Sequence, residues 1–207
     1  MERECYERHL PHWYPSGATL FLTMRLAGSL PQPLVAQIRA DFHRAQELAG
    51  DDETALVEVR RQYFGRFDGF LDAGLPESPR WLAEPNVAAL MLESLHWVAK
   101  RGDFEPLAVC VMPNHLHAVV TLPSELIRPF EQTLRDFKQY TALHANQLLH
   151  RAGPFWQSET YDHVIRDPGD GTGLARVIQY VLHNPVKARL CADWLMWPGT
   201  WCTPLAM

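Results

Sequence analysis

The chain has 207 residues, of which 47% are hydrophobic and 21% charged, and its formal net charge at pH 7 is −5. This length and composition are typical of a globular protein with one domain. No apolar run approaches the roughly 18–20 residues that cross a bilayer, and Met1–Cys5 is charged, so we expect a cytoplasmic protein. The scattered cysteines form no Cys-x-x-Cys pair, which argues against a zinc knuckle and favours free thiols.

The charge also bears on nucleic acid as a partner. A negative chain argues mildly against it, because phosphate binders are usually basic. The charge is uneven, however: acidic residues outnumber basic ones over 41–105, whereas basic residues outnumber acidic ones over 126–191. The overall sign therefore does not exclude a local basic groove in the second region.

The first half of the chain predicts one strand followed by helices. Residues 1–17 have the breakers of an irregular lead-in, and 18–26 predict a strand with one wholly apolar face. Apolar residues then recur at helical spacing. The predicted helices start near Leu34, after a cap at Asp51 or Asp52, and at Pro85.

The second half opens with a predicted hairpin. The apolar run 107–112 is typical of a central strand, Pro113-Asn114 predicts a turn, and 115–122 alternates as a strand does. A long helix is expected from Ile127 to about residue 150, a weaker strand at 161–166, and a last helix from Thr172 to Asn184-Pro185. The aromatic and proline-rich tail predicts a strap packed on the body.

His115 and His117 are the first candidates for chemistry. Successive side chains of a strand point to opposite faces, so both imidazoles project from the same face. Leu116, Ala118 and Val120 form an apolar face on the other side. Two imidazoles fixed side by side are half of a divalent-metal site. The alternative is a pair of partly buried histidines that cap the strand.

Tyr180 and Asn184 are the second pair of candidates. They are four residues apart in the predicted last helix and so lie on the same face. An asparagine oxygen is an acceptable ligand for Mg²⁺ or Mn²⁺, which prefer oxygen donors and keep positions open for phosphate. Taken alone, the tyrosine is equally typical of packing, and an asparagine before proline of a helix stop.

Distinctive segments are spread in order along the chain: Leu10–Trp13 with Ala18–Leu26, Val111–His117, Gly153–Gln157, Tyr161–Arg166 and Tyr180–Ala188. In these segments the chain, from Leu10 to Trp197, resembles the REP-associated tyrosine transposases, relatives of the IS200/IS605-type transposases. At Arg189 relatives commonly have a glycine, so an altered helix exit is expected there.

The resemblance implies an α+β fold, an antiparallel β-sheet flanked by α-helices, which is the ferredoxin-like palm of HUH endonucleases. The chain would be a single domain over 1–207, with an enlarged helical crossover at about 33–103 and a C-terminal strap at about 186–207. The resemblance further implies that His115 and His117 bind the divalent cation, that Tyr180 is the nucleophile, and that Asn184 completes the metal site.

The implied activity is cleavage and rejoining of single-stranded DNA at REP-like hairpins through a 5′-phosphotyrosine. A tyrosyl ester stores the energy of the broken bond, which suits strand transfer. Such an enzyme would act as a monomer or homodimer. The candidate DNA-binding side chains are the basic groups around the site and one tryptophan that could stack a base: Arg25, Arg135, Lys138, Trp156, Arg166 and Lys187. Solvated surface cations and a buried core tryptophan are the alternatives.

Two other functions remain open from the sequence. One is a DNA-hairpin-binding protein that no longer nicks, which would have no need of His115, His117 and Tyr180 together. The other is a metal-dependent hydrolase of small phosphate esters, which would ignore DNA and tolerate loss of Tyr180.

Overall fold

The computed structural model describes residues 5–7, 11–165 and 172–204, and its contacts divide the chain into two compact units. The first unit comprises Met1–Ala27 and Arg80–Met207, and the second comprises Gly28–Pro79. All the candidate site residues belong to the first unit. Among the described helices, none has both the length and the hydropathy needed to cross a bilayer.

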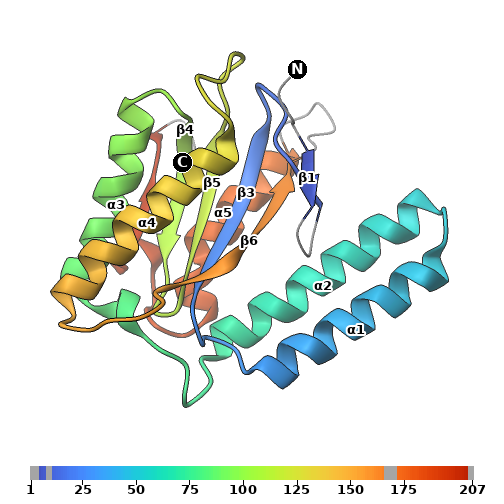
Figure 1. Cartoon of the computed structure of the whole chain (residues 1–207), viewed down its shortest axis with the longest axis horizontal. Helices are drawn as coiled ribbons and strands as arrows, with labels where there is room; N and C mark the ends of the chain where they lie inside the picture. Colours follow the sequence, from blue (N-terminus) through green and yellow to red (C-terminus); the bar gives the residue numbers. More distant parts are fainter. Residues whose placement is uncertain (1–4, 8–10, 166–171, 205–207) are drawn as a thin grey trace. The chain divides into compact units, whose positions relative to one another are not determined.

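A five-stranded sheet is the centre of the first unit (Figure 1). Every pair of neighbouring strands is antiparallel, so the α+β prediction is confirmed. The strands, in their order across the sheet, are β6 (Trp156–Val164), β3 (Thr19–Leu26), β5 (His115–Thr121), β4 (Glu105–Val111) and β7 (Thr200–Cys202). A separate two-stranded sheet pairs β1 (Cys5–Glu7) with β2 (Pro11–Trp13).

The predicted hairpin is β4 and β5. Its turn is closed by the Met112 N–H, which donates to the His115 carbonyl at 2.8 Å. Two further backbone bonds hold the turn: the Leu26 N–H donates to the Asn114 carbonyl at 2.9 Å, and the Leu82 N–H donates to the Pro113 carbonyl at 3.1 Å. The turn before the histidines is therefore fixed from both sides.

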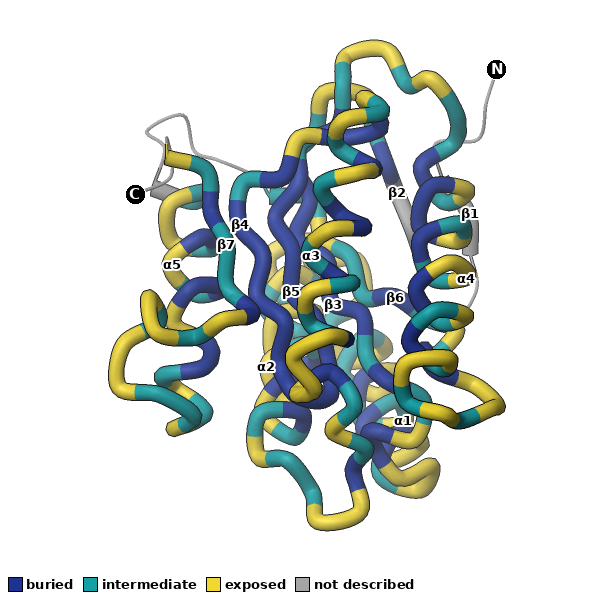
Figure 2. Tube along the Cα trace, turned by 90° about the vertical axis from the view of Figure 1, so that its left-hand side faces the viewer, coloured by how far each residue is buried: buried dark blue, intermediate teal, exposed yellow. Residues whose placement is uncertain are grey.

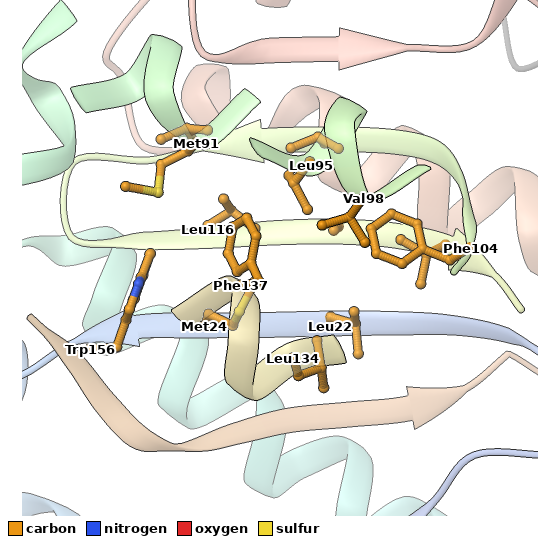
Figure 3. Close-up of a cluster of buried hydrophobic side chains, with 14 of the residues drawn as sticks. Leu22, Met24, Met91, Leu95, Val98, Phe104, Leu116, Leu134, Phe137 and Trp156 are labelled. Atoms are coloured by element: carbon orange, nitrogen blue, oxygen red, sulfur yellow. The ribbon is translucent and has the colours of Figure 1, made fainter. Parts of the chain in front are cut away.

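One face of the sheet carries the main hydrophobic core. Helices α3 (Pro85–Lys100) and α4 (Phe130–Leu148) lie on this face and contact each other. Figure 3 shows Leu22, Met24 and Leu116 of the strands together with side chains from both helices. The alternation predicted for 115–122 is confirmed here, because Leu116, Ala118 and Val120 all belong to this core.

The other face of the sheet is covered by α5 (Thr172–Lys187), which packs against β4 and β5. Its buried apolar residues are Ile178, Val181 and Leu182. In Figure 2 the strands run between α5 on one side and α4 on the other. Since His115 and His117 alternate with Leu116, they project toward the α5 face.

The second unit is a helical hairpin. Helix α1 (Gln32–Ala49) is followed by α2 (Glu53–Ala73), and the two pack along each other. The predicted cap is Asp52, whose carboxylate accepts from the N–H groups of Thr54 and Ala55 at 2.9 and 3.1 Å. The rings of Phe42 and Tyr63 pack with their centroids 4.3 Å apart. The predicted helices between the first two long strands are thus present as α1, α2 and α3.

Several element boundaries differ from the predictions. Helix α4 begins at Phe130 rather than Ile127, because a residue before proline, here Arg128 before Pro129, disfavours the helical region. The predicted stop at Asn184-Pro185 was wrong, since α5 continues through Pro185 to Lys187. Strand β6 starts at Trp156, ahead of the predicted 161.

The strap contains a strand that the sequence did not predict. β7 pairs with β4 and becomes the edge of the sheet. The strap approaches β4 closely at Gly199, whose carbonyl accepts from the Val111 N–H at 2.8 Å. A Cβ at position 199 would lie 2.5 Å from the Val111 carbonyl oxygen, so only glycine fits without moving the strap.

Candidate metal and nucleophile site

The histidine pair is buried at the start of β5. Both His115 and His117 are 0% exposed. Their rings meet edge to face with centroids 4.6 Å apart, and the two Nε2 atoms are 3.0 Å from each other. The strand alternation thus brings both imidazoles together with the same nitrogen of each ring turned toward the other.

The remaining ring nitrogens are held by neighbouring side chains. His115 Nδ1 lies 2.7 Å from Asn114 Oδ1, and His117 Nδ1 lies 2.8 Å from Thr23 Oγ1. Thr23 is the residue directly opposite His117 in the pairing of β3 with β5. Such partners on the far nitrogen fix the orientation of metal-binding histidines. Neither Asn114 nor Thr23 was predicted as a site residue.

Tyr180 lies beside the histidine pair within the same chain. Its ring centroid is 5.9 Å from that of His117 and 6.1 Å from that of Phe21. Phe21 in turn stacks on His117 with an interplanar angle of 25° and a centroid distance of 5.3 Å. The Lys187 ammonium is 5.1 Å from the Tyr180 ring centroid. An aromatic cluster therefore connects the predicted nucleophile to the predicted metal ligands.

Asn184 is buried one helical turn beyond Tyr180. It is 0% exposed, and neither Oδ1 nor Nδ2 has a hydrogen-bond partner among the described residues. An unpaired buried polar group costs about 1–3 kcal/mol, so a well-packed interior normally avoids one. A buried amide without partners is expected of a side chain that binds a ligand.

These residues fit a divalent cation. Ligand bonds of about 2.0–2.1 Å at roughly a right angle place two donors about 3 Å apart, and the Nε2 atoms are separated by 3.0 Å. Imidazole nitrogens suit Zn²⁺, Mn²⁺ and related ions, and an amide oxygen suits Mg²⁺ or Mn²⁺. His115 and His117 could hold such an ion, and the buried Oδ1 of Asn184 has no hydrogen-bond partner among the described residues.

The predicted DNA-binding side chains divide between the two faces. Arg25, half-buried on β3, pairs with His115 in the strand register, and Lys187 is exposed on α5. Arg135 and Lys138 are on α4, which covers the opposite face of the sheet. Arg166 lies outside the described residues.

Two of these residues have contacts within the protein. The Lys138 ammonium donates to the carbonyls of Gln157, Ser158 and Glu159 at 3.0, 3.2 and 3.4 Å. Trp156 is 8% exposed in the core, and its indole N–H donates to Thr141 Oγ1 at 2.9 Å. Trp156 is therefore a buried core residue, which was the alternative to base stacking, and we do not include it in the proposed DNA interface.

The exposed side of α5 adds basic residues that the sequence reasoning did not single out. Arg176 and His183 are exposed and lie on the same side of the helix as Lys187. The segment Thr172–Lys187 contains no acidic residue. Helical spacing from Tyr180 could have identified this stripe, since Arg176 is one turn before it and Lys187 two turns after it.

The fold and the site define an α+β protein whose central antiparallel sheet carries a buried histidine pair beside a helix tyrosine. No family model matches the chain. The chain is 30% identical over 108 residues to a curated Haemophilus influenzae protein named "Putative REP-associated tyrosine transposase". The matched part is 44% of this chain and 56% of the relative, so the chain spans little more than half of that relative's length.

The fold is also similar to a solved structure, described as a REP-associated tyrosine transposase bound to a REP hairpin. The TM-score is 0.51 and the sequence identity 19%, with 94% of this chain and 80% of the other covered. At that identity the likeness shows the fold alone. The curated relative supports the resemblance to REP-associated tyrosine transposases that the sequence motifs indicate, and the solved structure supports the fold that this resemblance implies.

Proposed function

We propose that this protein is a metal-dependent strand transferase that cleaves and rejoins single-stranded DNA at hairpin sequences. The observation that carries the proposal is the Tyr180 ring 5.9 Å from that of His117, whose Nε2 is 3.0 Å from the Nε2 of His115. A nucleophile beside a paired-imidazole site is needed for this reaction. A protein that only binds hairpins has no use for it.

Tyr180 performs the covalent step. Its phenol oxygen forms a bond to the scissile phosphorus, and the bond from phosphorus to the 3′ oxygen breaks. The phenol proton leaves and the 3′ oxygen gains one, so a 5′-phosphotyrosine and a 3′ hydroxyl result. One phosphate ester replaces another, which lets the reverse reaction rejoin the strand without an added energy source.

The charge around the phenol favours this step. An ordinary phenol has a pKa of about 10, so attack requires positive charge near the phenol and the phosphate. The Lys187 ammonium, 5.1 Å from the Tyr180 ring, supplies one such charge. A cation held by His115, His117 and Asn184 would act as a Lewis acid on the phosphoryl oxygens.

Nucleic acid is the proposed partner. The exposed basic stripe of α5, formed by Arg176, His183 and Lys187, borders Tyr180 and suits a phosphate backbone. The solved structure with the similar fold is described as bound to a REP hairpin. We propose a hairpin for this chain as well. The nucleophile would be supplied in cis, since Tyr180 and the histidines meet within one chain, and a monomer would suffice.

A covalent adduct tests the proposal directly. The full chain is incubated with labelled DNA hairpins and Mn²⁺, and SDS-resistant protein–DNA species are measured on a denaturing gel. We expect an adduct that disappears with chelator and in Tyr180→Phe. The matched control is Tyr140→Phe, because Tyr140 is 52% exposed on α4 at the opposite face and its loss should leave the adduct unchanged.

Two outcomes would refute the proposal. An adduct that persists in Tyr180→Phe would exclude Tyr180 as the nucleophile. Tight hairpin binding that gives no adduct with any hairpin, and that chelator and Tyr180→Phe leave unchanged, would show a protein that binds without nicking.

A further inference from the structure

We propose that the Thr23 hydroxyl is a positioning group that sets the tautomer of His117 and reverses its hydrogen-bond role when a cation binds. In the metal-free protein it would donate to His117 Nδ1, and in the loaded protein it would accept from the same nitrogen. The inference rests on the metal site of the proposed function. Its experiments are chosen so that the two can fail separately.

Asn114 sets the tautomer of His115. Its Oδ1 atom lies 2.7 Å from His115 Nδ1, and an amide oxygen can only accept a hydrogen bond. His115 Nδ1 must therefore carry the proton of the neutral imidazole. His115 Nε2 then carries a lone pair instead of a proton, and it faces His117 Nε2 at 3.0 Å.

The short distance between the Nε2 atoms determines the tautomer of His117 in the metal-free protein. Two nitrogen lone pairs at 3.0 Å repel each other, whereas one N–H donating to the other nitrogen makes a normal hydrogen bond. His117 must then carry its proton on Nε2. Its Nδ1 is left as an acceptor, and the Thr23 hydroxyl at 2.8 Å donates to it.

Cation binding requires the opposite tautomer. A ligand nitrogen must offer its lone pair to the ion, so the His117 proton moves from Nε2 to Nδ1 with no change in net charge. The Nδ1–H then needs an acceptor at the same place. A hydroxyl has one donor and two lone pairs, so Thr23 can fill both roles, whereas a carbonyl could fill only the second.

Neighbouring side chains prevent the His117 ring from turning to present a different nitrogen to the ion. Phe21 stacks on the imidazole with centroids 5.3 Å apart, and Tyr180 contacts it from α5 at 5.9 Å. His117 is also 0% exposed. With the ring plane fixed, the proton must move between the nitrogens, and Thr23, itself only 6% exposed, is placed to follow it.

Calorimetric titration of the full chain with Mn²⁺ tests the role of the hydroxyl. Thr23→Val keeps the size and β-branching of the side chain but removes the donor and acceptor. Loss of a partner to a metal-binding histidine typically costs about 10–100-fold in metal affinity, and we expect that loss here. Thr23→Ser retains the hydroxyl and should restore most of the affinity.

Thr19 provides the matched control. It lies on the same face of β3, four residues earlier, and its hydroxyl bonds that of Thr121 at 3.0 Å. Thr19→Val should leave the Mn²⁺ affinity unchanged. Equal affinity in Thr23→Val and the wild type would overturn the inference while leaving the metal site intact. Absence of Mn²⁺ binding by the wild type would instead refute the metal site itself.

A second measurement needs no variant. Nitrogen-15 NMR of the imidazoles distinguishes a protonated from a bare ring nitrogen, and Mg²⁺ is diamagnetic. We expect the His117 proton on Nε2 in chelator and on Nδ1 with saturating Mg²⁺, while His115 keeps its proton on Nδ1 in both. A His117 proton on Nδ1 in both states would overturn the proposed reversal even if Thr23→Val fails to fold.

Discussion

Replacing Asn184 by leucine should make the metal-free protein more stable and the metal-loaded protein no more stable than before. Leucine has nearly the shape of asparagine but no polar atoms. Both polar side-chain atoms of Asn184 are buried and unpaired among the described residues. Removing such a group relieves a penalty of about 1–3 kcal/mol, so we expect a gain of about 2 kcal/mol in chelator.

The same substitution should remove the stabilisation by metal. A ligand at 100 times its Kd stabilises the folded state by about 2.7 kcal/mol, provided that its site is intact. The wild type should thus be the less stable protein in chelator and should gain from Mn²⁺. Asn184→Leu should gain little. With roughly 2–4 °C in Tm per kcal/mol for a chain of this size, Asn184→Leu should melt about 4–8 °C above the wild type in chelator and about 1–3 °C below it in Mn²⁺.

Thermal unfolding followed by far-UV circular dichroism, with chelator and with Mn²⁺, measures both effects. Ser94→Ala is the matched control, because Ser94 Oγ is also buried and unpaired among the described residues but lies on α3, at the other face of the sheet. It should leave the Mn²⁺ shift unchanged. A variant Asn184→Leu that is less stable than the wild type in chelator, or that keeps the full Mn²⁺ shift, would refute the assignment of Asn184.

Three further predictions follow from other parts of the structure. Arg189→Gly should stabilise the protein by about 1 kcal/mol in urea unfolding, whereas Arg189→Ala should not. The reason is that position 189 has φ +58°, where a non-glycine residue costs about 1–2 kcal/mol. Equal stability of the two variants would contradict this. Arg176→Gln should reduce the slope of log K against log salt for hairpin binding by about 0.7, measured by fluorescence anisotropy, and Arg135→Gln on the other face should not. The Arg61 side chain, which bonds Glu58, lowers the pKa of that carboxyl to about 2. As the pH falls, the unfolded chain therefore takes up this proton before the folded chain does. The contribution of the Arg61–Glu58 pair to stability is full above about pH 4.5 and is lost toward pH 2. Glu58→Gln should remove this dependence in acid unfolding, and an NMR titration midpoint near 4.5 for Glu58 would refute it.

The C-terminal end of α5 shows a prediction that identified the right residue, Arg189, but the wrong effect. The sequence indicated an altered helix end at Arg189. The structure has the usual pair of terminal bonds instead, with the Arg189 N–H donating to the Val186 carbonyl and the Leu190 N–H to the Pro185 carbonyl, both at 2.9 Å. Arginine thus adopts the left-handed conformation that glycine would adopt more easily. The bonds are kept, and the cost is in backbone strain.

Periodicity predicted the faces of the site but not its neighbours. The alternation around His115 and His117 placed both imidazoles on one face, because side-chain direction is a local property of a strand. The register between two strands is not local. Thr23 faces His117 only because β3 and β5 pair with one particular offset, and no pattern within either strand encodes that offset.

Short elements escaped prediction for a related reason. Strands β1, β2 and β7 have three residues each, too few to show alternation. β7 exists because Gly199 lets the strap approach β4, and that close contact is made between residues far apart in the chain. Asp52 and Pro85, by contrast, act within their own first turn of helix, and both were predicted from local sequence.

Lys138 has a consequence for the site despite lying on the far side of the sheet. The pairing of β6 with β3 shifts between Met24 and Leu26, and the carbonyls that bond the Lys138 ammonium belong to the three residues of β6 in that bulge. By bonding these three consecutive carbonyls, the ammonium stabilises the bulge. Beyond the bulge, Tyr161 pairs with Thr23 and so shares the face of the histidines. A slip of one residue would exchange Tyr161 for Asp162 on that face. Lys138 would in this way decide whether an aromatic ring or a carboxylate borders His115, His117 and Tyr180.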